Sequence, residues 1–555
     1  MLQALAALAL LADPSVESQL CARSLRPGEL ERLEQAQGPL DGSDLTRAEL
    51  ELDVGKRRVA GAWHLLATVP LAGEPRLTVR AAANVVAPGA VRLLKLKLDG
   101  RPARVSERDG GLWVVALPPG VRPGDRVELE ARLEATIPRA AVDTDALGAA
   151  MGVEDFGLLA ATGEVVNLAG LFPLVERKER AAPPSGLGDL TAASPQRFLV
   201  TVTASKGYRV LASGAQLADA PLPDGRGRFS FAVAGARDFG LLALKGAQVE
   251  TRRVGEVTVE AWAGPGETEG ARRMADTAAQ SLEALEARLG PSPYATLRVV
   301  SFRLTGGAGG AEFPGLVTVS QQQVKGGADP LEALGLPGFQ QLPGAKALLP
   351  AVEALRRDAL ELTVEHEVAH QYFAVLVGSD PVEHPATDEA LAQHVALLLH
   401  EWRRGAAAAQ ATRQRELVLG YQVFRFWGGE DEAADRPTTD FRSATEYSAL
   451  VYGKAPLLYD AERALLGDAA WQEALRRYVA ASRWRLAEPR GLTRVAQTLA
   501  PAQAQALEQL HTRWWDEAHG DEDLGPMALQ APSLAGTDAQ TRKLFEQALK
   551  ALQGE

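Results

Sequence analysis

Short stretches in which apolar and polar residues alternate fill the first half of the chain. Alternation at every second residue is typical of a strand with one buried face. Pro-Gly and Asp-Gly pairs, such as Pro119-Gly120 and Asp99-Gly100, separate the stretches and indicate turns. We therefore expect a β-sandwich or saddle domain over residues 45–250. Its predicted strands are at 48–52, 77–81, 112–117, 126–133, 198–204 and 229–233.

The spacing of apolar residues changes after residue 250. A long amphipathic helix is predicted at 267–289, and Gly290 and Pro291 close it. Beyond Glu389 the pattern is helical to about residue 517. The expected units are an N-terminal segment at 1–44, the first domain at 45–250, a mostly helical second domain at 251–525 with strands at 257–262, 297–304 and 316–320, and a C-terminal tail at 526–555 with a helix at 539–552.

Two neighbouring helices of the second domain are expected on either side of a loop at 378–387. Gly378 and Pro381 would end the first helix, and Asp388 would cap the second. Apolar stripes on both helices predict that the two pack against each other. The residues of these stripes are Leu360, Val364, Val368 and Val375 in the first helix and Leu391, Val395, Leu398 and Leu399 in the second.

The first of these helices contains the run His-Glu-Val-Ala-His, from His366 to His370. Two imidazoles four positions apart lie on one face of a helix, because four residues are slightly more than one turn. Both can therefore bind one metal ion. Glu367 lies about 100° further round the helix, so its carboxylate sits beside the metal. That position suits a general base acting on a zinc-activated water.

Glu389 follows His370 after a spacer of eighteen residues and is the third candidate ligand. Packing of the two helices would bring it to the histidines. Two nitrogens, one carboxylate oxygen and one open position are the ligands of a catalytic zinc site. One alternative is a pair of histidines with a structural role in the helix. Another is a structural zinc, but such sites are usually closed by cysteines and Cys21 is the only one in the chain.

This arrangement resembles that of the gluzincin zinc aminopeptidases related to aminopeptidase N and leukotriene hydrolase. Residues 310–315, Gly-Ala-Glu-Phe-Pro-Gly, resemble the family's Gly-x-Met-Glu-Asn segment, and Tyr452-Gly453-Lys454 resembles its catalytic-tyrosine segment. Residues 371–373 and 388–390 resemble its Gln-Trp-Phe and Asn-Glu-Gly segments. The resemblance covers about residues 45–524. It implies a multidomain α+β fold, in which a β-sandwich or saddle precedes a thermolysin-like, mostly helical zinc catalytic domain.

The resemblance also implies the roles of individual residues in a metallopeptidase. One zinc ion per chain would be held by His366, His370 and Glu389. Glu367 would take a proton from the attacking water and pass it to the leaving amine, and the Tyr452 hydroxyl would stabilise the oxyanion of the transition state. Tyr447 and Tyr459 are nearby alternatives to Tyr452.

An aminopeptidase must also bind the free amine of its peptide substrate. Glu312 is the candidate for this role, and the segment around it, with Gly309, Gly310 and Ala311, would lie along the peptide as an added strand. Glu164, nine residues before Pro173, is a weaker second candidate.

The same segment departs from the family pattern in two places. Ala311 stands where the family has Met, and Phe313 where it has Asn. Preference for a particular first residue therefore cannot be transferred. Two other functions stay open: a zinc endopeptidase of thermolysin type, and a peptidase-fold binding protein with weak or lost turnover. Among the remaining histidines, His394 is the one expected to lie close behind the metal ligands.

Composition narrows the class of protein. With 46% hydrophobic residues the chain can form sizeable cores, and a net charge of -12 argues against a nucleic-acid-binding surface. No run reaches the roughly 18 apolar residues of a membrane span. Residues 1–12 could be the core of a short signal peptide but lack the usual basic start, so exported and cytoplasmic locations both stay open.

Overall fold

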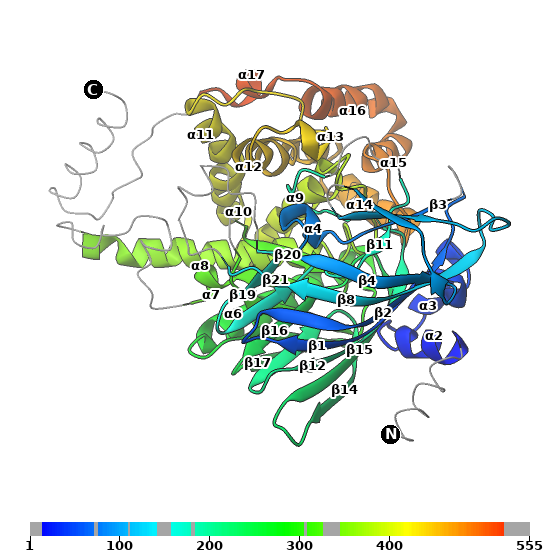
Figure 1. Cartoon of the computed structure of the whole chain (residues 1–555). Coiled ribbons are helices and arrows are strands. Elements are labelled where there is room, and N and C mark those ends of the chain that lie inside the picture. Colours follow the sequence, from blue (N-terminus) through cyan, green and yellow to red (C-terminus); the bar gives the residue numbers. More distant parts are fainter. Residues whose placement is uncertain are drawn as a thin grey trace.

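The computed structural model describes residues 14–71, 76–108, 111–140, 157–178, 184–191, 193–304, 308–325 and 345–526. A strand-rich N-terminal part is followed by a largely helical C-terminal part (Figure 1). This order confirms the predicted fold class. The possible signal segment at 1–12 and the tail helix expected at 539–552 lie outside the described residues.

Among the described residues, the N-terminal part has sixteen strands in three sheets, which follow helices α2 (Pro14–Ala22) and α3 (Glu29–Gln37) in the sequence. The strands are β1 (Leu45–Asp53), β2 (Arg58–Thr68), β3 (Arg76–Arg80), β4 (Val91–Leu98), β5 (Arg101–Pro102), β6 (Val105–Arg108), β7 (Leu112–Ala116), β8 (Arg126–Thr136), β9 (Leu159–Ala161), β10 (Val165–Leu168), β11 (Leu174–Val175), β12 (Gln196–Ala204), β13 (Tyr208–Ala212), β14 (Ala215–Pro221), β15 (Gly227–Ala236) and β16 (Leu241–Lys245). All six predicted strands are present.

The largest sheet has eight strands in the order β14-β15-β12-β1-β2-β8-β4-β5. The predicted strand β8 shows the alternating pattern: it buries Val127, Leu129 and Leu133, and the residues between them are more exposed. The two four-stranded sheets have the orders β13-β16-β10-β9 and β11-β3-β7-β6. Together these sheets form the scaffold from which segments reach the helical part.

A further sheet of five strands opens the second part of the chain. Its strands are β17 (Gln248–Val254), β18 (Val257–Ala263), β19 (Thr296–Phe302), β20 (Gly310–Phe313) and β21 (Leu316–Ser320), in the order β17-β18-β19-β21-β20. Helix α6 (Thr268–Leu289) packs against β17 and β18. β20 pairs antiparallel with β21 and is an edge strand. The sheet begins just before residue 251, where the second domain was expected to start.

The described residues after β21 are mainly helical, as predicted for the part beyond Glu389. The elements are α7 (Gln321–Val324), α8 (Ala345–Ala369), α9 (Ala386–Arg404), α10 (Ala406–Arg413), η3 (Gln414–Leu419), α11 (Gly420–Phe426), η4 (Thr438–Asp440), α12 (Ala444–Tyr447), η5 (Ser448–Lys454), α13 (Leu457–Leu466), α14 (Asp468–Ser482), α15 (Gly491–Leu499), η6 (Pro501–Gln503), α16 (Ala504–His511), η7 (Thr512–Asp516) and α17 (Gly520–Leu524). α8 packs against both α6 and α9.

Two expectations about helix ends were wrong. α8 ends at Ala369, well before Gly378, because backbone N–H groups of residues 371 and 372 bond three residues back and tighten its last turn. Ala374 then has a φ of 115°, which no helix accommodates. α9 begins at Ala386, so Asp388 lies inside its first turn and does not cap it.

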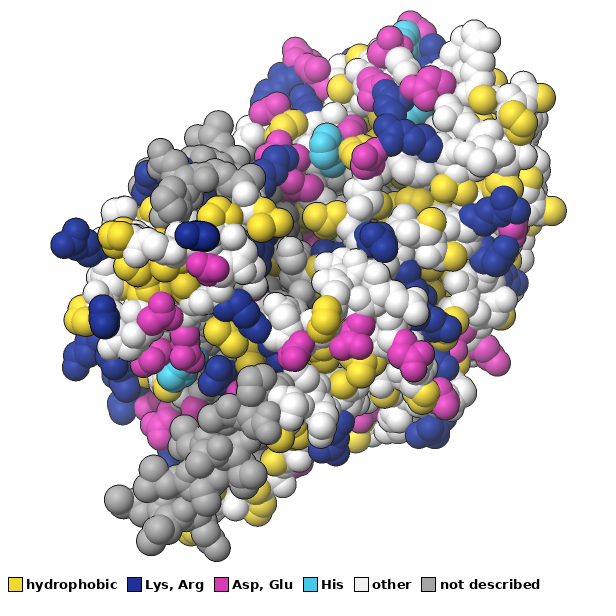
Figure 2. Space-filling model, turned by 90° about the vertical axis from the view of Figure 1, so that its right-hand side faces the viewer, with side chains coloured by type: hydrophobic (Ala, Val, Ile, Leu, Met, Phe, Trp, Pro, Cys, Tyr) yellow, Lys and Arg dark blue, Asp and Glu magenta, His cyan; other side chains and the backbone are white. Residues whose placement is uncertain are grey.

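The molecular surface carries mixed charge. On the face drawn in Figure 2, Lys and Arg side chains are interspersed with Asp and Glu side chains. Within the described residues, no helix combines the length and the apolar character that crossing a membrane requires.

A buried lysine fixes η5 to its surroundings. The Lys454 side chain is fully buried, and its Nζ lies 2.8 Å from Asp431 Oδ1 and from the carbonyl oxygens of Glu432 and Glu517. These three acceptors satisfy all three donors of the ammonium group. The C-terminal end of η5 is therefore tied to two loops distant in sequence.

We predict that Lys454→Met lowers the free energy of unfolding by about 3–5 kcal/mol, because it leaves the buried Asp431 carboxylate without its cation. Chemical denaturation monitored by circular dichroism would measure the change. Lys178→Met is the matched control: that lysine is 55% exposed in its 3.3 Å ion pair with Asp380, so the expected loss is at most about 1 kcal/mol. Equal losses in the two variants would contradict the prediction.

Candidate active site

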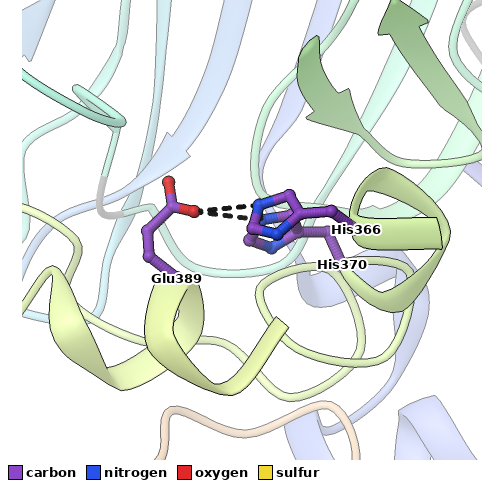
Figure 3. A group of neighbouring side chains, drawn as sticks. All are labelled: His366, His370 and Glu389. Carbon is purple, nitrogen blue, oxygen red and sulfur yellow. Dashed lines mark hydrogen bonds and ion pairs between the residues drawn. The ribbon is translucent and has the colours of Figure 1, made fainter. Parts of the chain in front are cut away.

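Three side chains from two helices meet at one point. His366 lies in the last turn of α8, His370 directly after it, and Glu389 in the first turn of α9 (Figure 3). The Nε2 atoms of the histidines are 2.9 Å apart, and Glu389 Oε2 lies 3.3 Å from that of His366 and 3.2 Å from that of His370. The structure thus brings together all three predicted ligands.

The size of this triangle fits a zinc ion. Ligand atoms about 2.0–2.1 Å from a tetrahedral zinc lie about 3.3 Å from one another, close to the spacing of these three atoms. His370 Nδ1 is 2.8 Å from the carbonyl oxygen of Phe373. The Nδ1–H group donates to this oxygen, which leaves the Nε2 lone pair directed at the other ligands.

The electrostatic environment supports the same assignment. Burial lowers the pKa of His366, so its imidazole stays neutral as a ligand must. Burial alone would raise the pKa of Glu389, but His370 and His366 outweigh it and hold the pKa well below its usual range. Three carboxylates, those of Glu312, Glu389 and Glu367, raise the pKa of His370 against the effect of burial. The same negative field would hold a divalent cation.

Glu367 lies where a general base is needed. Its side chain is buried, and burial raises the pKa of the carboxyl group to about 8. Its Oε2 has no hydrogen-bond partner among the described residues. A Cβ on Gly310 would be only 2.2 Å from Glu367 Oε1, so residue 310 must be glycine for β20 to pass this close. The carboxylate is therefore held between α8 and β20.

β20 places Glu312 on the same side as the ligands. Glu312 Oε1 lies 3.8 Å from His370 Nδ1, and only 7% of the side chain is exposed. Ala311 and Phe313 face the opposite way and pack in an apolar cluster with Val300 and other residues. The Ala311 side chain therefore faces away from the ligands. Gly309 precedes this strand and packs against Thr363 of α8.

Tyr452 lies beside the ligands on η5. Its ring centroid is 5.9 Å from that of His366, and its hydroxyl interacts with Glu389. η5 is a π-helix, a form that often marks functional sites. Tyr447, five residues earlier, has its ring centroid 5.8 Å from that of Tyr452. Tyr459 packs instead against His394 and two tryptophans.

Two sequence-based candidates lie elsewhere. Glu164 is exposed in the turn before β10, where it lies close enough to affect Tyr208, and no described interaction joins it to the ligands. His394 bonds Asp460 and Trp471. Gln393, one residue earlier, is the one that interacts with His366. The expectation for His394 was wrong because residue 393 faces α8.

Asp189 is a site residue that the sequence did not indicate. It belongs to a segment between β11 and β12, far from every motif in sequence, yet Glu312, Glu389 and His370 are among the groups that act most strongly on its carboxyl group. Gln371 also proves important: its Oε1 accepts from Gly315 N–H and its Nε2 donates to the Phe313 carbonyl. Only the resemblance of residues 371–373 to a family segment could have pointed to Gln371.

The fold is similar to that of solved M1 zinc metallopeptidases. A solved structure of the M1 zinc metallopeptidase from Deinococcus radiodurans aligns over 85% of this chain and 94% of its own, with 18% identity and a TM-score of 0.56. A mutant of that enzyme bound to a Tyr-Ser-Ala substrate aligns over 87% and 96%, with 17% identity and a TM-score of 0.57. A two-domain M1 zinc metallopeptidase mutant bound to L-arginine aligns over 86% and 94%, with 18% identity and a TM-score of 0.56.

Neither a protein-family model nor a curated protein matches the sequence. The likeness of the fold to the solved structures, and not a match of the sequence, confirms the predicted resemblance.

Metal binding at the triangle can be tested without a substrate. We expect metal analysis to find one zinc per chain, and zinc at one hundred times its Kd to stabilise the stripped protein by about 2.7 kcal/mol. Calorimetric melting with and without zinc measures this gain. His370→Ala should abolish it, and the control His384→Ala should retain it, because His384 pairs with Asp435 instead. Equal zinc stabilisation of both variants would refute the assignment.

Proposed function

We propose that this protein is a zinc-dependent metallopeptidase, and specifically an aminopeptidase that removes N-terminal residues from peptides. The observation that carries the proposal is the triangle of His366, His370 and Glu389 with the unpartnered Glu367 carboxylate beside it. Structural neighbours in complex with a tripeptide substrate and with an amino acid support the substrate class.

A zinc ion held by the three ligands would activate a water molecule and polarise the scissile carbonyl. Glu367 would accept the proton of this water and later pass it to the leaving amine. Its raised pKa suits both steps, because such a group gains and loses protons near neutral pH. The Tyr452 hydroxyl would donate a hydrogen bond to the oxyanion as charge develops on it.

The edge strand β20 offers a place for the peptide. An edge strand has unpaired backbone groups on one side, so an extended peptide can add to the sheet there. Glu312 on this strand would bind the free ammonium group of the first residue. A buried carboxylate needs a cationic partner to offset its lost hydration, and an N-terminal ammonium supplies one. This need favours an aminopeptidase over an endopeptidase.

We predict that aminoacyl and tripeptide reporters with free amines are cleaved, and that their N-acetylated counterparts are cleaved at least about 100-fold more slowly, because losing a charged hydrogen-bonded pair costs about 3 kcal/mol. Measuring kcat/KM on both sets, with and without chelator, provides the test. Preferential cleavage of internal bonds in blocked peptides would instead support the thermolysin-type endopeptidase. Binding of peptides without turnover would support a binding protein.

Two substitutions separate the proposed roles. Glu367→Gln should keep zinc and lower kcat by about 10²–10⁴, because the proton acceptor is lost. Tyr452→Phe should also keep zinc and lower kcat by about 10²–10³, as for loss of one oxyanion donor. Tyr459→Phe is the control and should turn over normally. Normal turnover by the Tyr452→Phe variant would rule out its assigned role.

A further inference from the structure

The segment at 184–191 reaches from the N-terminal sheets to the catalytic helices. Ser185 Oγ donates a 3.0 Å hydrogen bond to the carbonyl oxygen of Thr438. The Leu187 side chain is buried in an apolar cluster with Phe441, Tyr447 and Leu450. A polar and an apolar contact thus fix the segment to the elements that carry Tyr452.

Gly188 brings the backbone of this segment against Tyr447. Its φ is +61°, and a Cβ at this position would lie 2.3 Å from the Tyr447 hydroxyl. Both the conformation and the lack of space require glycine. Because residue 188 is held in this way, the position of residue 189 is closely determined.

Asp189 therefore enters the site at a defined place. The carboxyl groups of Asp189 and Glu312 each act on the pKa of the other, and Asp189 also raises the pKa of Glu367 and of Asp388. The strongest electrostatic influences on Asp189 include other carboxylates and His370 but no Lys or Arg. Two carboxylates side by side repel each other unless a proton or a cation lies between them.

We propose that Asp189 is a specificity-determining residue that binds, together with Glu312, the N-terminal ammonium group of the peptide substrate. The inference rests on the proposed function and assigns a residue to the amine subsite from outside every recognised motif. An ammonium group offers three donors and one positive charge, which two adjacent carboxylates can match. Every peptide with a free N-terminus carries this group.

The placement of Asp189 also distinguishes it from Glu164. Both come from the N-terminal part of the chain, but Glu164 is exposed, whereas Asp189 is partly buried and its carboxyl group acts on the pKa of Glu312. Amine recognition would therefore depend on the docked segment at 184–191, and not on the turn before β10. The two residues can be compared directly.

The first experiment measures kcat and KM on free-amine reporters for Asp189→Asn, Asp189→Glu and Glu164→Gln. We expect Asp189→Asn to lower kcat/KM by about 10- to 100-fold, mainly through KM, because binding to the ammonium is weakened in both ground and transition states. Asp189→Glu should restore part of the loss. Asp224→Asn, in the exposed turn between β14 and β15, is the matched control and should not differ from the wild type.

The second experiment measures binding without turnover. In a Glu367→Ala background, calorimetry would measure the affinity for Leu-Ala-Ala and for N-acetyl-Leu-Ala-Ala. The comparison shows whether Asp189→Asn weakens the binding of the free peptide alone. We expect the affinity for the free peptide to fall by about 10-fold or more, and the affinity for the blocked peptide to fall by less than about 3-fold. Thermal melting and zinc content would show that the variant is folded and loaded.

Several results would overturn the inference. One is a KM effect from Glu164→Gln without one from Asp189→Asn. Another is an Asp189→Asn loss confined to substrates with a basic first side chain, since that would place the residue in a side-chain pocket. A third such result is an equal loss of affinity for the free and the blocked peptide. If the wild type cleaves no reporter, the proposed function fails, and the calorimetric comparison still decides the role of Asp189.

Discussion

The packing of α8 against α9 sets the one distance on which the site depends. Val364 and Val368 of α8 and Leu391 and Val395 of α9 are all buried, and they hold the two helices together. Because ligand atoms must lie within a few tenths of an ångström of their ideal positions, helix packing rather than any single hydrogen bond fixes the site. The apolar stripes are therefore as much a part of the site as the ligands.

This geometry concentrates negative charge in a buried space. Besides Glu389, the carboxylates of Glu367, Glu312, Asp189 and Asp388 influence one another. Burying so many carboxylates costs free energy, and cations or shared protons have to offset the cost. A divalent metal and a substrate ammonium supply three positive charges. The same electrostatic demand thus accounts for both the metal and the preference for a free amine.

The sequence predicted what local periodicity and motif spacing determine. Nine of the strands, the long α6 and the two histidines could be inferred because each depends on residues a few positions apart, and Glu389 could be inferred from its motif spacing. The end of α8 could not, because it follows from a tight last turn and the backbone conformation at Ala374. Glu164 was proposed from its distance to Pro173 in sequence, but no spacing rule describes how the turn between two strands is oriented.

Asp189 shows where such prediction reaches its limit. Nothing in the sequence Gly-Leu-Gly-Asp-Leu at 186–190 indicates a site. The position of this segment depends on contacts with residues more than two hundred positions away along the chain, such as that between Ser185 and Thr438. The segment belongs to one part of the molecule and acts in the other. The amine subsite would thus be completed only when the N-terminal sheets and the catalytic helices are docked. Exopeptidase selectivity would then depend on the interface between the two parts, and hydrolysis on the ligands and base that α8 and α9 hold.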